Sequence, residues 1–493
     1  MKIEPLRKVT FNDYALLTPG IRSLYVETKW GASHFQTTRD VENALAKLKG
    51  FTCYVTHGLE QLKNTTSARS WQMTTWRGKG IKMTHIPTGV VVTSLRSTLE
   101  HSRNPFADLD RTLTWLRGYG VNAGSISSMS WKLLRASLGG MVPVYFDPEL
   151  SERAFFGGRQ EIKKPGISNN AKLYDLSAAY PSAMASRDVA LALKKVSPLT
   201  DIDPLQAGLA EIRVTVPDDL EYPPLPVRLS KQAIQFQRGT FEGVYSWVEI
   251  DAAKRLGCDV EILNCYAPSR TADLFSNWWI IAQEGRHLPG ESSHLAKAIA
   301  NSTWGQFAMR GDDRAEINWA DDKGREAFIT SVDPRAMPHI TALGIAAEIT
   351  ARVRTQTLLE GIYASDVAPE HVDTDGIILP FKAKPPKNLG TGFGQWREKE
   401  SMSVVQILAP QFYRFRRESE WYFNDEGVKV EAPWNYVASG MSHDLAQKTF
   451  ERNPVESQIA YLSISDVCLP AANASDQALI DRLLLEAKTL GVA

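Results

Sequence analysis

The chain has 493 residues, of which 43% are apolar and 23% are charged, a composition typical of a folded protein and unlike that of disordered or fibrous chains. At about 150 residues per domain, this length predicts three or four domains. No apolar run approaches the roughly 20 residues of a membrane-spanning helix, and no apolar stretch follows the basic residues 1–8 as it would in a secretory signal. We therefore expect a cytoplasmic protein that has no membrane partner.

Charged residues are distributed unevenly, although Lys and Arg together number 56 and Asp and Glu together also number 56. Residues 1–150 contain 19 basic and 11 acidic residues, whereas the rest of the chain contains 37 and 45. A basic N-terminal third suits a polyanion-binding module beside a carboxylate-rich site, and uneven scatter of surface charge explains the numbers equally well. The four cysteines lie far apart without a C-x-x-C pair, which predicts reduced, partly buried thiols and no structural zinc site.

In chain order, the first 150 residues mix strand-like runs with helical stretches, an α/β texture. Strands are expected at 23–26 and 86–92, and helices at 41–49 and 109–119. A helix at 124–135, with Ser125 as its N-cap, is expected to close the first domain. The later pattern predicts a half-buried strand at 210–216 ended by Pro217, two helices within 272–310 joined near 288–290, and a core-packing helix at 475–490.

An apolar strand that ends in a carboxylate is predicted at 172–182, which reads K-L-Y-D-L-S-A-A-Y-P-S. Asp175 ends the strand, and the small residues of the following turn have backbone N–H groups that can face a phosphate. We interpret the segment as a corner for metal and phosphate. Taken alone, an aspartate at a strand end is more often a helix cap or a turn former.

Two aspartates follow at 371–379, in the segment H-V-D-T-D-G-I-I-L. Asp373 and Asp375 point the same way if the backbone is extended, or straddle a hairpin turn. Carboxylates packed so closely repel one another unless a cation offsets their charge, so the pair predicts a divalent ion. An ordinary exposed D-T-D-G turn is the alternative.

A helix is predicted at 297–305, which reads K-A-I-A-N-S-T-W-G. Lys297, Asn301 and Trp304 fall at positions i, i+4 and i+7 and therefore share one face. A cation for phosphates and a flat ring for a base make a surface that can read a nucleotide. Taken alone, the segment is better explained as an amphipathic helix with a snorkelling lysine and a buried tryptophan.

Together and in this order, the three segments resemble motifs A, B and C of the family B DNA polymerases. The separations, 122 residues from Asp175 to Lys297 and 76 from Lys297 to Asp373, are most similar to those of the compact protein-primed phage and plasmid branch. The segment F-F-G-G-R at 155–159 resembles the Y-x-G-G element before motif A, and Q-F-Y at 411–413 resembles the K-x-Y element after motif C. Gln411 thus replaces the lysine that helps to hold the primer terminus in the family.

The resemblance, which covers roughly residues 124–430, implies an α+β fold: a right-hand polymerase with palm, fingers and thumb and an N-terminal RNase H-like exonuclease-type domain. The implied domains are a degenerate exonuclease-like DNA-binding domain at 1–150, a palm at 151–265 and 311–430, fingers at 266–310 and a thumb at 431–493.

The resemblance also implies template-directed addition of dNTPs to a 3′-hydroxyl by two-metal phosphoryl transfer. Asp175 and Asp375 are the implied ligands of two Mg²⁺ ions, which Mn²⁺ could replace, and Asp373 is an auxiliary catalytic carboxylate. The implied nucleotide-binding residues, with Tyr180 as a steric gate against ribonucleotides, are Ala178, Ala179, Tyr180, Arg286, Lys297 and Asn301. The implied DNA-binding residues are Phe155, Gly157, Gly158, Arg159, Trp304, Gly305, Gln411, Tyr413 and Arg414.

Relatives usually carry a 3′–5′ exonuclease at the N-terminus, with four metal-binding carboxylates. At 23–28, where D-x-E is expected, Tyr25 occupies the Asp position before Glu27, and no N-x-x-[FY]-D pattern occurs around 53–60. We therefore expect no proofreading and a degenerate exonuclease fold that is retained for DNA contact. An unrelated N-terminal fold is the alternative.

The implied partners are primer-template DNA, dNTPs and a terminal protein or other replication proteins, in the cytoplasm of a bacterial host if the chain is phage-encoded. Two other activities stay open at this point: a primase-polymerase or primer-independent polymerase, and a reverse transcriptase. A third alternative is a non-catalytic replication factor that binds DNA through an inactive polymerase fold. Tyr180 disfavours ribonucleotide use, and the three carboxylates disfavour the inactive factor.

Overall fold

The structure is a computed structural model, and it divides into two compact units, each built from two stretches of chain. The first unit combines Met1–Pro143 with Leu274–Ala342, and the second combines Val144–Asp273 with Leu343–Ala493. The residues that the structure describes are 14–20, 23–55, 59–76, 79–95, 98–99, 101–139, 147–163, 166–198, 203–228, 234–308, 314–319, 322–323, 327–331, 342–409, 411–418, 421–423, 429–431, 433–438, 447 and 450. The two units cut across the four domains implied by the sequence, whose boundaries stay a prediction.

The first unit contains a mixed sheet of nine described strands in the order β17-β16-β5-β6-β7-β4-β1-β2-β3. β4 is parallel to both β1 and β7, and the other neighbours are antiparallel. The strands are β1 (Tyr14–Gly20), β2 (Ser23–Thr28), β3 (Gly31–Phe35), β4 (Thr52–Val55), β5 (Trp71–Trp76), β6 (Lys79–His85), β7 (Val90–Ser94), β16 (Arg314–Trp319) and β17 (Ala327–Ser331).

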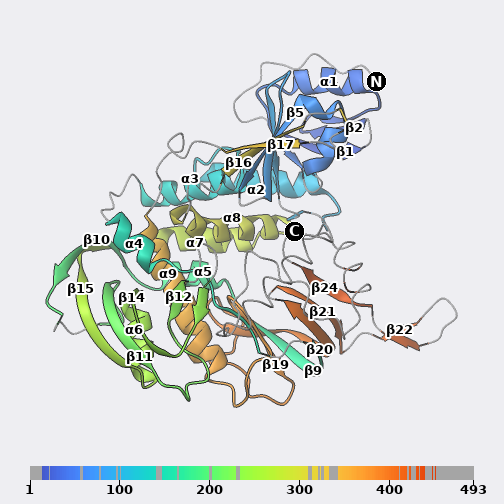
Figure 1. Ribbon diagram of the computed structural model, residues 1–493. Coiled ribbons are helices and arrows are strands. Elements are labelled where there is room, and N and C mark those ends of the chain that lie inside the picture. Colours follow the sequence, from blue (N-terminus) through green and yellow to red (C-terminus); the bar gives the residue numbers. More distant parts are fainter. Residues whose placement is uncertain are drawn as a thin grey trace. The chain divides into compact units, whose positions relative to one another are not determined.

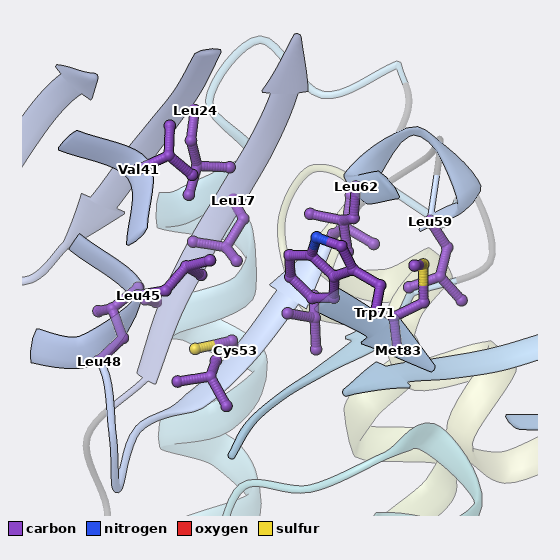
Figure 2. Packing of buried hydrophobic residues seen from close by; sticks show 14 of the residues in the cluster. Leu17, Leu24, Val41, Leu45, Leu48, Cys53, Leu59, Leu62, Trp71 and Met83 are labelled. Carbon is purple, nitrogen blue, oxygen red and sulfur yellow. The ribbon is translucent and has the colours of Figure 1, made fainter. Parts of the chain in front are cut away.

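The core of this sheet is formed by side chains from the strands, from helix α1 (Thr38–Lys47) and from the 3₁₀ turns η1 (Leu59–Asn64) and η2 (Ala68–Ser70). Figure 2 shows Val41 and Leu45 of α1 beside Leu17 and Leu24 of the strands, with Trp71 near η1. α1 begins at the cap residue Thr37, whose side chain accepts a hydrogen bond from the backbone of Asp40. The helix predicted at 41–49 and the strand predicted at 23–26 are thus confirmed.

The strand predicted at 86–92 is wrong over its first half. β6 ends at His85 and β7 begins at Val90, and the residues between them form a turn in which the Gly89 N–H donates to the His85 carbonyl at 2.8 Å. Pro87 has no N–H for a strand ladder, and Gly89 takes a φ of +71°. Local turn chemistry therefore delays the start of the strand until Val90, and the apolar run Val90–Val92 lies in β7.

Four longer helices complete the first unit: α2 (Pro105–Gly118), α3 (Ile126–Leu138), α7 (Ser276–Arg286) and α8 (Ser292–Phe307). α8 packs against the other three. Ser125 caps α3 by accepting a hydrogen bond from the Ser128 N–H at 3.1 Å, as its sequence predicts. α7 and α8 are the two helices predicted within 272–310.

The second unit contains a seven-stranded sheet in the order β24-β21-β20-β9-β19-β18-β8 and a four-stranded sheet in the order β10-β15-β11-β14. Figure 1 shows β9 of the larger sheet between β19 and β20. The strands of the larger sheet are β8 (Gln160–Ile162), β9 (Gly166–Leu176), β18 (His371–Asp373), β19 (Gly376–Pro380), β20 (Trp396–Ala409), β21 (Phe412–Arg417) and β24 (Asn435–Ala438).

The smaller sheet and its helices surround α9 (Leu343–Gln356), which packs against α4, α5 and α6. β11 covers the predicted strand at 210–216 and ends before Pro217. The remaining elements are α4 (Pro148–Ala154), α5 (Ala179–Ala185), β10 (Val189–Val196), β11 (Leu209–Val216), β12 (Pro226–Arg228), β13 (Ile234–Phe236), β14 (Gly239–Ser246), α6 (Trp247–Arg255), β15 (Asp259–Ala272), η5 (Thr357–Ile362), β22 (Trp421–Phe423) and β23 (Lys429–Glu431).

Two predictions fall outside the described residues: the helix at 475–490 and the thiol of Cys468. The other three cysteines are free and buried, as predicted. None of the described helices has both the length and the apolarity that a bilayer crossing demands.

Candidate active site

Asp175 and Asp375 lie next to each other, although 200 residues separate them in the sequence. Asp175 is near the end of β9, where it pairs with Gly376, the first residue of β19. The Leu176 N–H donates to the Asp375 carbonyl at 2.8 Å, which fixes the two chain segments at this point. The strand-end position predicted for Asp175 and the neighbouring aspartate pair therefore converge at one edge of the larger sheet.

The D-T-D segment forms a hairpin, which decides between the two geometries left open by the sequence. Asp373 ends β18, and Thr374 and Asp375 form the turn before β19. Thr374 has a φ of +58°, which a β-branched residue adopts only under strain. Its carbonyl accepts from the Thr357 hydroxyl at 2.9 Å and its N–H donates to the Arg159 carbonyl at 2.7 Å, so the surroundings hold this turn in place.

Thr357 begins η5, a π-helical segment that continues α9. Such insertions are rare and occur frequently at functional sites. Gly361 of η5 lies so close to the sheet that a Cβ added there would be 3.0 Å from the Trp396 ring. The helix thus supports the side of the sheet that carries Trp396, and its first residue anchors the D-T-D turn.

The F-F-G-G-R segment packs against the same turn. A Cβ added at Gly158 would lie 2.7 Å from the Thr374 side chain, whereas one added at Gly157 would meet nothing within 4 Å. The buried Arg354 of α9 donates to the carbonyls of Phe156 and Gly157, both at 2.7 Å. Its charge is balanced by Glu249, 2.8 Å away and equally buried.

Arg159, the last residue of that segment, is 1% exposed, and its side chain contacts other residues of the protein. It donates to the Pro223 carbonyl at 2.9 Å, forms an ion pair with Glu161 at 2.5 Å, and lies 4.0 Å over the Phe236 ring. The Phe155 carbonyl accepts from Arg228. The buried Arg159 side chain therefore stabilises the loop at 155–159.

Two neutral amides hold Asp373. Gln411 donates to Asp373 Oδ1 at 2.9 Å and Gln160 donates to the same oxygen at 3.2 Å. Tyr413 is buried, and its ring lies 5.3 Å from that of His371. Burial raises the pKa of Tyr413, with smaller contributions from Asp373 and then Asp175.

The next residue, Arg414, has its own partners. It donates to Gln406 at 2.8 Å and lies 4.2 Å over the Trp434 ring.

The carboxylates repel one another. Burial raises the pKa of Asp375 to about 7, and Asp175 and then Asp373 add to the shift because ionising a third neighbouring carboxyl is unfavourable. Asp175 instead has cationic neighbours on β20: Arg397 Nη2 is 3.2 Å from its Oδ2, and Lys399 Nζ is 3.7 Å from its Oδ1. Sequence reasoning missed Arg397 and Lys399, since only the pairing of β20 with β9 brings them here.

Tyr180 follows Asp175 on the short helix α5. The turn between them includes Ala178, whose φ of +51° is unusual for a residue other than glycine. Burial raises the pKa of Tyr180, and Asp375 makes the next largest contribution. The ring therefore lies within the electrostatic influence of the carboxylates.

The residues of the helix predicted at 297–305 to read a nucleotide belong to the first unit. Lys297, Asn301, Trp304 and Gly305 lie on the partly exposed face of α8, whose opposite face is buried. The Asn301 Oδ1 is buried and finds no hydrogen-bond partner among the described residues. A Cβ added at Gly305 would meet nothing within 4 Å. Arg286 is the last residue of α7.

Residues 126–333 match the family model described as DNA polymerase type B, organellar and viral. Over this span, which is less than half of the chain, the sequence is similar to the family B DNA polymerases. The matched span contains the first two of the three sequence motifs, at 172–182 and 297–305, and ends before the third at 371–379. No curated protein matches the chain in sequence.

Solved structures of the phi29 DNA polymerase are similar to this chain in fold. Its orthorhombic crystal form has a TM-score of 0.65 at 12% identity, over 90% of this chain and 94% of that one. The same enzyme complexed with primer-template DNA has a TM-score of 0.65 at 13% identity, over 90% and 94% of the two chains. With primer-template DNA and incoming nucleotides, it has a TM-score of 0.64 at 13% identity, over 89% and 94%. At these identities, the likeness shows a shared mixed α+β fold.

The resemblance to this family implies metal-dependent catalysis, and the carboxylates of this chain fit a divalent cation. No group of three or more His, Cys, Asp and Glu side chains in the described part of the chain is arranged to hold a metal. Mg²⁺, however, is usually bound by one or two carboxylates together with water and substrate phosphates, not by a complete protein cage. Asp175 and Asp375 meet that requirement. Burial raises the pKa of Asp375, and the neighbouring carboxylates of Asp175 and then Asp373 add to the shift, so a cation bound between them would offset their repulsion.

Proposed function

We propose that this chain is a template-directed DNA polymerase that adds dNTPs to a primer 3′-hydroxyl by two-metal phosphoryl transfer and has no 3′–5′ proofreading activity. The observation that carries the proposal is the meeting of Asp175 and Asp375 at the joined ends of β9 and β19. The solved complexes of the phi29 DNA polymerase with primer-template DNA and nucleotides support the choice of substrates.

In this proposal, Asp175 and Asp375 would hold two Mg²⁺ ions, for which Mn²⁺ could substitute. When bound, the ions would activate the 3′-hydroxyl and stabilise the departing pyrophosphate. Asp373, held by Gln160 and Gln411, serves as an auxiliary carboxylate. Because phosphoryl transfer requires little covalent chemistry from protein groups, the chain contributes mainly by positioning the reactants and by balancing charge.

Nucleotide binding is assigned to two places. The backbone from Ala178 to Tyr180 and the side chains of Lys297 and Arg286 would contact the triphosphate, and Asn301, with its unpartnered buried oxygen, would line the base pair. Trp304 and the open space at Gly305 would accept the template base.

Tyr180 would act as a steric gate under the sugar. Its test is the ratio of rNTP to dNTP incorporation, which we expect to rise in Tyr180→Ala and to stay unchanged in Tyr180→Phe, because Phe keeps the ring. An unchanged ratio in Tyr180→Ala would refute the gate.

DNA contact is assigned to the loop of Phe155, Gly157 and Gly158, and to the segment of Gln411, Tyr413 and Arg414. Arg159, for which the sequence implied a DNA contact, is buried and would instead support this loop. The close packing of Gly158 and the hydrogen bonds of Arg354 hold the loop against the D-T-D turn. DNA bound to the loop would therefore have a fixed position relative to the carboxylates. The basic surplus of residues 1–150 supplies further attraction for the phosphate backbone.

Extension of a labelled primer on a template, with dNTPs and Mg²⁺, tests the proposal. We expect wild-type extension and at least a roughly 10³-fold loss in Asp175→Asn and in Asp375→Asn, with primer-template affinity nearly retained. Asp366→Asn is a matched control, since Asp366 is an exposed carboxylate of the same unit that accepts from the Lys384 N–H. Extension retained by either site variant would refute the metal assignment.

The same assay separates the alternatives. An unprimed template detects a primase or primer-independent polymerase, an RNA template detects a reverse transcriptase, and a terminal protein offered as primer tests protein priming. DNA binding without any extension would indicate the non-catalytic replication factor.

A further inference from the structure

Strand β20 places two cations on the side of the sheet that carries Asp175. Arg397 is paired with Asp175 in the register of β20 and β9, so the two side chains lie on one face. Lys399 lies where the register shifts between Glu398 and Glu400, and a bulge of this kind re-aims side chains. Through it, Lys399 reaches Asp175 as well.

These contacts occupy both oxygens of Asp175. Arg397 uses Oδ2 at 3.2 Å and Lys399 approaches Oδ1 at 3.7 Å. The side chains of Arg397 and Lys399 are 41% and 50% exposed, compared with 20% for Asp175. Both cations can therefore leave the carboxylate without unpacking the sheet. The Arg397 Nε, in addition, is buried and has no hydrogen-bond partner among the described residues.

A divalent cation on Asp175 would compete with both side chains for the same oxygens. Once displaced, two positive side chains beside a metal ion are stable only if an anion faces them. A primer whose 3′-hydroxyl lies at Asp175 brings such an anion, because the phosphodiester that joins its last two nucleotides is the DNA charge nearest to that hydroxyl.

The residue at the lysine position of the K-x-Y element does not supply this charge. Gln411 is neutral, and its amide donates to Asp373 at 2.9 Å. The segment that resembles K-x-Y is thus used to hold a carboxylate, which leaves the primer phosphate to other groups.

From these contacts, and resting on the proposed function, we propose that Arg397 and Lys399 bind the terminal phosphodiester of the primer. In the absence of DNA they neutralise Asp175. In the complex they release Asp175 to the metal and hold the primer end, and so replace from β20 the cation that is missing at position 411.

The test measures DNA binding without nucleotide addition. Anisotropy of a labelled primer-template in Ca²⁺ gives the dissociation constant for two DNAs: an ordinary duplex and one whose terminal primer phosphodiester is a neutral methylphosphonate. We expect wild type to bind the ordinary duplex about tenfold more tightly than the methylphosphonate duplex, because charge-assisted hydrogen bonds to the phosphate are lost. In Arg397→Gln/Lys399→Gln we expect this difference to disappear.

Lys172→Gln is the matched control. Lys172 is also on β9 and forms an ion pair with Glu398 at 2.8 Å, but strand alternation places this pair on the opposite face from Asp175. The control removes one positive charge and one ion pair, and we expect it to keep the tenfold difference. Arg397→Lys/Lys399→Arg keeps both positive charges, so we expect it to keep most of the tenfold difference in affinity. This variant also shows whether β20 tolerates substitution at these two positions.

A double glutamine variant that discriminates between the two DNAs as wild type does would overturn the inference. If that variant also binds Mn²⁺ more tightly, as measured by electron paramagnetic resonance, the two cations are only counter-ions of Asp175. Wild type that discriminates between the DNAs but never extends a primer would refute the proposed function and leave this inference standing.

Discussion

Asp375 makes the stability of the metal-free protein depend on pH. Its pKa is raised to about 7 in the folded protein from the ordinary aspartate value of 3.8, so between these values the folded state keeps a proton that the unfolded state has lost. This group therefore lowers the free energy of unfolding by up to about 4 kcal/mol as the pH rises from about 4 to 7. Above pH 7 its contribution no longer changes.

Asp375→Asn removes the ionisation. In EDTA at pH 8 we expect its melting temperature to exceed that of wild type by a few degrees, and near pH 4 we expect no difference. Mg²⁺ should raise the melting temperature of wild type more than that of the variant. A variant that is less stable than wild type at pH 8 in EDTA would contradict the prediction.

Gly158 has no room for a side chain, and its neighbour provides the control. A methyl group at Gly158 would meet the Thr374 side chain at 2.7 Å, and one at Gly157 would meet nothing. We expect Gly158→Ala to lower the free energy of unfolding by about 1–3 kcal/mol through overpacking, and Gly157→Ala to change it by less than about 0.5 kcal/mol. Urea unfolding of the two variants measures the difference, and equal values would show that the loop yields freely.

At the scale of elements, Arg354 connects three of them. From α9 it reaches the carbonyls of Phe156 and Gly157 in the loop after α4, and Glu249 on α6. Arg354→Leu leaves Glu249 buried without its positive partner, so we expect a loss of about 3–5 kcal/mol in the free energy of unfolding. Removing Glu249 as well, in Arg354→Leu/Glu249→Leu, should restore part of it.

An exposed ion pair of the same unit controls for the loss of charge. Arg255 lies 3.6 Å from Asp251 on α6 and its side chain is 64% exposed. We expect Arg255→Leu to cost less than about 1 kcal/mol, because exposed pairs contribute little. Similar losses in Arg354→Leu and Arg255→Leu would show that Arg354 does not hold these elements together.

Local sequence determined which of these elements could be foreseen. Ser125 signals the start of α3 because a cap needs only its own turn, and the alternation of 210–216 signals β11. The D-T-D spacing left a hairpin and an extended strand open, because both place carboxylates together. Arg397 could not be linked to Asp175, since a strand pairing across 222 residues leaves no local pattern.

At the scale of the whole molecule, chain order and spatial order differ. The first unit takes in Leu274–Ala342 from the middle of the chain, and β16 from that stretch pairs with β5 of the N-terminal sheet. A division of the sequence into consecutive domains cannot predict this strand pairing. Changes in composition along the chain indicate linkers, but they do not indicate which strands pair. The motifs, by contrast, retain their order and spacing whatever the path of the chain between them, so a candidate site could be proposed without knowledge of the architecture.

The N-terminal sheet is the part of the molecule where proofreading would be expected, and its first four strands contain a single carboxylate, Glu27. Burial raises the pKa of Glu27, and no other acidic residue of these strands could share a metal with it. Because two-metal hydrolysis needs several carboxylates around the ions, we expect no 3′–5′ degradation of labelled single-stranded DNA in Mg²⁺, and mismatched primer ends should persist. Wild type and Glu27→Ala should behave alike; degradation that Glu27→Ala abolishes would reveal an active exonuclease, whereas degradation that survives it would come from a contaminating nuclease.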